Sequence, residues 1–200
     1  MNGMDMMRVG VYEGAFAPIH KGHVEAAKAF MEQMKLDYLF VIPTYLGGSD
    51  DPLYRLKMCE LAFEDTDGVV ISDAAIAGGE RSSLYHILCE LQRPDTRLFL
   101  LFGTDTVLDF DSRPNYEEIL KMSYPTYARR EDDPLMTSRI VAKIGEIYEK
   151  HGVMFRRIVK DSVSLSSTSV RRAVKEGRDI SGMVSPSVEK FIRDNRLYLD

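Results

Sequence analysis

Two histidines, three residues apart, are the side chains of this sequence that are best suited to chemistry on a phosphate group. His20 and His23 follow a glycine at position 14 and a short apolar run over 9–12, and a helical pattern begins near His23. A turn of this kind between a strand and a helix presents backbone N–H groups and the positive end of a helix dipole to an anion. Imidazoles add donors that can be neutral or charged near pH 7. Segment 14–23 therefore predicts a polyphosphate site.

Two further segments carry suitable groups at comparable places. Gly103-Thr104-Asp105 ends the apolar run over 97–102, and Ser166-Ser167-Thr168 begins a helical pattern with Arg171 one turn inside it. Either segment alone is typical of an ordinary turn or a helix N-cap. Ligands of an open α/β sheet bind outside the carboxyl ends of its strands, however, and all three segments fall at such ends. Their coincidence predicts one shared site.

A metal site is the alternative for the histidine pair. Two histidines at this spacing could bind a metal ion, but the sequence shows no third ligand at a spacing that zinc sites use. We therefore predict no protein-held metal.

The elements that must position these groups alternate along the chain. Apolar runs predict strands over 9–12, 38–42, 69–71, 97–102, 125–129 and 153–159, and helical spacing predicts helices over 24–34, 54–62, 84–91, 116–122 and 135–150. This alternation indicates an α/β fold with a Rossmann-like parallel sheet and helices on both faces. We expect one domain over 1–200, with a flexible N-terminal extension over 1–7 and a C-terminal helical segment over 165–200.

Composition narrows the possible partners. The 200 residues are 44% hydrophobic and 28% charged, with a net charge of −5, so no overall basic field attracts nucleic acid or an anionic membrane. No apolar run approaches the roughly 20 residues of a membrane span. We expect a cytoplasmic protein whose two cysteines, Cys59 and Cys89, are buried reduced thiols. The sequence leaves homo-oligomerisation open.

The motifs together resemble a known family. Phe16-x-Pro18-x-His20-x-Gly22-His23 resembles the first signature of the HxGH nucleotidyltransferase superfamily, and Ser166-Ser167-Thr168-x-x-Arg171 resembles its second. Gly103-x-Asp105 lies between them, and 183–188 follows, as in nicotinate-nucleotide (nicotinamide-nucleotide) adenylyltransferases. The resemblance spans 9–198.

The resemblance implies a nucleotidyltransferase fold and a reaction of NAD biosynthesis. ATP and nicotinate mononucleotide, or nicotinamide mononucleotide, would be the substrates, with Mg²⁺ arriving with ATP, and the products would be the dinucleotide (deamido-NAD from the acid) and pyrophosphate. The implied catalytic residues are His20, His23 and Arg171. The implied nucleotide-binding residues are Gly14, Ala15, Phe16, Gly103, Asp105, Ser166, Ser167 and Thr168. Candidates on the side of the second substrate are Arg55, Ser83 and Tyr85.

The first loop departs from the family pattern. Glu13 stands where a glycine is usual, Ala15 lacks a hydroxyl, Ala17 replaces an aspartate, and 44–54 contains no lysine. A carboxylate beside a triphosphate is repulsive unless it points away or meets a cation. Another phosphate-monoester acceptor, or a nucleotide-binding protein without turnover, therefore remains an alternative.

Overall fold

Parallel pairing defines the fold of the computed structural model. Within the described residues 6–45, 51–79, 83–128, 134–159 and 165–199, six strands form one sheet in the order β3-β2-β1-β4-β5-β6. The strands are β1 (Met7–Gly14), β2 (Tyr38–Pro43), β3 (Val69–Ile71), β4 (Thr96–Gly103), β5 (Ser123–Ala128) and β6 (Arg156–Ile158). The helices are α1 (Lys21–Met34), α2 (Pro52–Ala62), α3 (Ala74–Gly78), α4 (Leu84–Leu91), α5 (Thr104–Leu108), η2 (Phe110–Ser112), α6 (Tyr116–Met122), α7 (Pro134–His151), α8 (Ser167–Lys175) and α9 (Pro186–Asp194).

Helices cover both faces of the sheet, as the alternation of elements predicts. In β4, Leu98, Leu100 and Phe102 join the core that α3 to α7 cover. Phe99 and Leu101 point to the opposite face and join the core of α1, α2, α8 and α9. Strands buried on both faces need apolar residues at nearly every position, which accounts for the continuous apolar runs. None of the described helices has the length and apolar character to cross a membrane.

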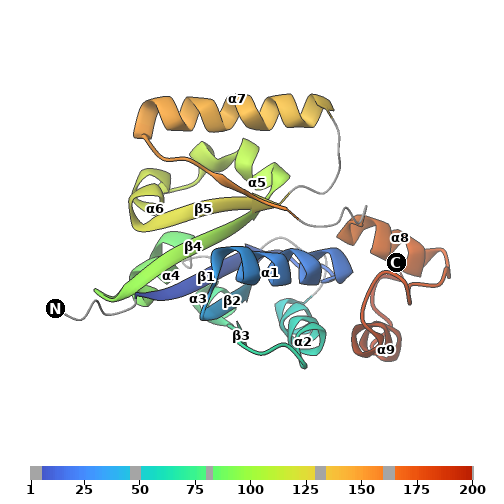
Figure 1. The fold of residues 1–200 in the computed structure, drawn as a ribbon. Coiled ribbons are helices and arrows are strands. Elements are labelled where there is room, and N and C mark those ends of the chain that lie inside the picture. Colours follow the sequence, from blue (N-terminus) through green and yellow to red (C-terminus); the bar gives the residue numbers. More distant parts are fainter. Residues whose placement is uncertain (1–5, 46–50, 80–82, 129–133, 160–164, 200) are drawn as a thin grey trace.

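Strand order reverses between β1 and β4, the two central strands. The chain continues from β1 to β2 and β3 on one side, and from β4 to β5 and β6 on the other. Tyr12 pairs with Leu101, so the carboxyl ends of β1 and β4 lie side by side. Figure 1 shows α8 and α9 together at the end of the sheet opposite the amino terminus. These elements therefore gather where an open parallel sheet binds its ligands.

Most of the expected elements are present, and the differences have local causes. Gly103-Thr104-Asp105 is not only a turn, because Gly103 is the N-cap of α5. The short helices α3 and η2 were not predicted, since five and three residues give too little periodicity to recognise. β6 is shorter than the expected 153–159 because it pairs with β5 over three residues only. Met7, expected in the extension, begins β1, and 1–5 lie outside the described residues.

The core around α1 gives a first test. Phe30 of α1 is 0% exposed and packs in the cluster with Leu39 and Phe99. Phe30→Ala should lower the free energy of unfolding by about 3–5 kcal/mol, because the truncation leaves a cavity. Leu135→Ala is the control, since Leu135 is 74% exposed, and should change stability by less than about 0.5 kcal/mol. Chemical denaturation of both variants measures this, and equal losses would contradict the packing described.

The cysteines give a second test, and one expectation about them is wrong. Cys59 is buried, whereas Cys89 is exposed on α4. Burial raises the pKa of the Cys59 thiol, which suppresses the reactive thiolate. An aromatic disulfide reagent should label Cys89 in the native protein and Cys59 only after unfolding. The variant Cys89→Ser retains only Cys59, so rapid labelling of this variant in its native state would contradict the burial of Cys59.

Candidate functional site

The two histidines stack against each other at the start of α1. His20 is the N-cap residue of this helix, and its backbone N–H donates to Nδ1 of His23 at 3.2 Å. The ring centroids lie 3.7 Å apart with an angle of 25° between the planes. Because Nδ1 of His23 accepts, the proton of the neutral ring is on Nε2.

Glycine at position 22 suits the close packing of the pair. A Cβ at Gly22 would lie 3.2 Å from two atoms of the His20 ring, which is closer than nine in ten real Cβ contacts, so the ring would have to shift. Phe16 supports the pair from the core, with its ring edge-to-face to that of His23 at 5.2 Å. Phe16 is 2% exposed, so its side chain packs in the core.

Three carbonyl oxygens of the loop after β1 are held by side chains from later helices. Nη1 of Arg55 in α2 donates to the Ala15 carbonyl at 2.7 Å. In α8, Nη1 of Arg171 donates to the Ala17 carbonyl at 2.5 Å, and Oγ of Ser167 donates to the Pro18 carbonyl at 2.9 Å. The loop geometry is therefore set by side chains that lie far from it in the sequence.

The N-termini of α1 and α8 meet at this loop. Ser167 of α8 contacts Pro18, two residues before the N-cap of α1, and a Cβ on Gly22 would lie 3.8 Å from that of Leu165. Each N-terminus presents backbone N–H groups and the positive end of a dipole. Two such ends at one place make a site for an anion of high charge.

The side chains of the Ser-Ser-Thr segment are engaged within the protein. Oγ of Ser166 caps α8 by accepting from Ser169 N–H at 3.0 Å, and the Ser166 N–H donates to Oγ of Ser169 at 3.1 Å. Oγ1 of Thr168 accepts from Nη2 of Arg171 at 3.2 Å. These contacts order the helix start, so backbone N–H groups of its first turn are the main donors that α8 offers to a ligand.

Glu13 meets a cation that the sequence did not indicate. Its carboxylate pairs with Nη1 of Arg113 at 2.8 Å, and the Glu13 side chain is 12% exposed. The Arg113 guanidinium also lies over the Phe102 ring, 5.7 Å from its centroid. The pair joins the end of β1 to the segment between η2 and α6. The positive charge of Arg113 also neutralises the unusual Glu13 carboxylate beside the loop.

Lys21 makes further contacts that the sequence did not indicate. Its N–H donates to the Met183 carbonyl at 2.9 Å, and its Nζ donates to the Ser181 carbonyl at 2.9 Å. The C-terminal segment is thereby fixed to the first residue of α1.

The remaining nucleotide-side residues lie at the neighbouring strand end. Gly103 ends β4 and caps α5, and Asp105 is exposed in the first turn of that helix. In the register of β1 and β4, Tyr12 pairs with Leu101. Gly14 and Gly103 follow two residues later and end their strands. The structure thus brings the three predicted segments to one edge of the sheet.

The three residues predicted for the second substrate do not form one cluster. Arg55 is 1% exposed and holds the carbonyls of Ala15 and Tyr45. Ser83 is the N-cap of α4, on the other face of the sheet, and its Oγ lies 3.0 Å from Nδ1 of His86. A hydrogen bond with Cys89 raises the pKa of the Tyr85 phenol.

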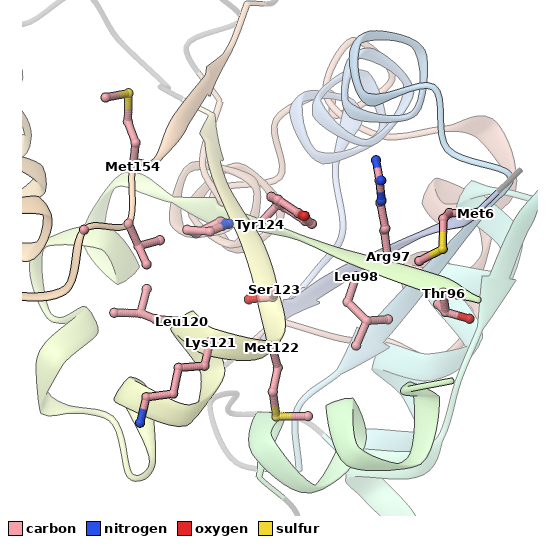
Figure 2. Close-up of a pocket in the computed structure, with 13 residues that line it drawn as sticks. Met6, Thr96, Arg97, Leu98, Leu120, Lys121, Met122, Ser123, Tyr124 and Met154 are labelled. Carbon is pink, nitrogen blue, oxygen red and sulfur yellow. The ribbon is translucent and has the colours of Figure 1, made fainter. Parts of the chain in front are cut away.

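Other possible sites are less suited to a ligand. Among the described residues, no three or more His, Cys, Asp or Glu side chains gather as metal ligands. A cavity of about 560 Å³ lies at the opposite, amino-terminal edge of the sheet, between the starts of β4 and β5, and none of the predicted site residues lines it. Figure 2 shows the charged ends of Arg97 and Lys121 there directed away from one another. That cavity offers no convergent charge.

Comparisons with known proteins identify the family of this chain. The family model "Cytidylyltransferase-like" matches residues 11–173. A relative named "Probable nicotinate-nucleotide adenylyltransferase" from Synechococcus sp. (strain JA-3-3Ab) is 30% identical, over 96% of this chain and 95% of the relative. A relative of the same name from Desulfatibacillum aliphaticivorans is 28% identical, over 96% of this chain and 100% of the relative.

A solved structure shares the fold. The nicotinic acid mononucleotide adenylyltransferase of Plasmodium falciparum, in complex with NaAD, superposes with a TM-score of 0.74 at 15% identity, over 96% of this chain and 97% of that one. The sheet order, the converging helix N-termini and the matched family model lead to one conclusion. The chain belongs to the cytidylyltransferase-like family and, within it, to the nicotinate-nucleotide adenylyltransferases, which are nucleotidyltransferases.

Proposed function

We propose that this enzyme transfers the adenylyl group of ATP to nicotinate mononucleotide, giving deamido-NAD and pyrophosphate. The observation that supports this best is the stacked pair of His20 and His23 where α1 and α8 meet. A nucleoside triphosphate carries enough negative charge to use both helix ends and both imidazoles. The names of the relatives support the choice of acceptor. Residues 1–200 would form a single domain for this reaction.

The proposed mechanism is a direct displacement without a covalent enzyme intermediate. The phosphate of the mononucleotide attacks the α-phosphorus of ATP, the bond to the bridging oxygen breaks, and pyrophosphate leaves with that electron pair. The enzyme supplies position and charge, as is general for transfer between phosphates. His20 and His23 stabilise the charge that develops on the α-phosphate, with the Nε2 proton of His23 as one donor.

The other nucleotide contacts follow from the arrangement of the loops. N–H groups of the first turn of α8, at Ser167 and Thr168, would hold the β- and γ-phosphates, and Arg171 would hold the loop while adding positive charge. Gly103 and Asp105 would lie against the ribose. Mg²⁺ enters as part of the MgATP substrate, with phosphate and water oxygens as most of its ligands.

The residues of the site define the second substrate less closely than they define ATP. Nicotinamide mononucleotide, or another phosphate monoester, would use the same ATP chemistry. Binding of ATP without turnover is the remaining alternative, and substitution of a histidine distinguishes it from catalysis.

Substitution of His20 tests the proposed chemistry. His20→Ala should lower turnover by at least ~10²-fold and change ATP affinity less than about threefold, because its donor acts mainly on charge in the transition state. His151→Ala is the control, since this histidine ends α7 and should retain activity. Steady-state kinetics and calorimetric ATP titrations measure both. Equal turnover in His20→Ala and the wild type would refute the assignment.

The pair of Glu13 and Arg113 gives a test of electrostatics. Arg113→Met leaves the Glu13 carboxylate without its partner beside the loop, so ATP affinity should fall about tenfold through repulsion. The double variant Glu13→Gln/Arg113→Met removes the negative charge as well and should regain most of that affinity. Calorimetric titration at low and high salt measures both. A double variant as weak as Arg113→Met would instead indicate that Arg113 binds the nucleotide directly.

A further inference from the structure

Arg55 is an unusual residue to find in the interior of this protein. It is 1% exposed and is the largest of the fully buried side chains among the described residues, in the face of α2 that also buries Met58 and Cys59. Arginine stays protonated in proteins, and burial of its charge is costly unless good hydrogen bonds compensate. Its position therefore calls for an explanation beyond packing.

The guanidinium connects two loops at the carboxyl edge of the sheet. Nη1 donates to the Ala15 carbonyl after β1 at 2.7 Å, and Nη2 donates to the Tyr45 carbonyl after β2 at 3.0 Å. Thr44 N–H donates to the Gly14 carbonyl at 2.9 Å, so the start of one loop already lies beside the start of the other. The planar fork of arginine fixes both carbonyls at once, which the compact ammonium of lysine cannot do in the same way.

The contact with Ala15 also fixes the direction of a neighbouring donor. A trans peptide is planar, so the N–H of Phe16 points opposite to the carbonyl of Ala15. Because that carbonyl faces Arg55, the Phe16 N–H is directed away from α2. The loop that follows leads directly into His20, the N-cap of α1.

We propose that Arg55 is a positioning residue: it orients the Ala15–Phe16 peptide for a nucleotide phosphate and couples the loop after β1 to the loop after β2. Arg55 does this from the interior of the protein, without touching either substrate. The consequence for activity rests on the proposed function, whereas the consequence for loop order does not.

Hydrogen exchange tests the loop order independently of activity. In Arg55→Met, backbone amides over 15–19 and 44–45 should exchange at least about tenfold faster, since the local opening energy falls. Arg8→Met is a matched control, because Nε of Arg8 also donates to a backbone carbonyl, that of Met34, at 2.7 Å. It should leave exchange over 15–19 and 44–45 unchanged. Unchanged exchange there in Arg55→Met would overturn the proposal.

Kinetics test the positioning role. The kcat of Arg55→Met should fall about 10²-fold, as for a misplaced reacting group, while KM for ATP changes less than about threefold. Arg55→Lys should be intermediate, and it carries both measurements if Arg55→Met does not fold. A higher KM with an intact kcat would show that Arg55 binds a substrate and would overturn the proposal. Wild-type protein without turnover would refute the proposed function alone, and hydrogen exchange would then decide the role of Arg55.

Discussion

The site depends on the anchoring of the carbonyl oxygens in the loop after β1. Arg55, Arg171 and Ser167 hold the carbonyls of Ala15, Ala17 and Pro18. A carbonyl oxygen that faced a polyphosphate would repel it, so holding these oxygens within the protein removes an obstacle to anion binding. The donors come from α2 and α8, and the site therefore exists only once the sheet and both helices have assembled.

This anchoring explains why the departures in the first loop are compatible with a phosphate site. Ala15 and Ala17 contribute carbonyl oxygens, which every residue type possesses, so the loop is held without a side chain at either position. Glu13 is paired with Arg113 and is largely shielded from solvent. The unusual residues thus change the details of the loop more than its ability to receive an anion.

The sequence predicted the architecture well because buried parallel strands and amphipathic helices have strong patterns. It also predicted that segments near 14–23, 103–105 and 166–171 share one edge, since strand ends converge in such sheets. It could not predict the long-range contacts. Glu13 and Arg113 are separated by 100 positions, and Ser167 resembles an ordinary cap residue. Arg55 was expected near the second substrate because 44–54 contains no lysine that could bind the substrate phosphate. Nothing in the sequence indicated that the Arg55 side chain is buried.

The proposed activity of this site is transfer of an adenylyl group from ATP to a pyridine mononucleotide. It can be tested by measuring pyrophosphate release from MgATP with nicotinate mononucleotide, nicotinamide mononucleotide and unrelated phosphate monoesters. We expect release that depends on a pyridine mononucleotide, is fastest with the nicotinate form, and yields the dinucleotide in equal amount. Release with neither pyridine mononucleotide, in a protein that binds ATP, would contradict it.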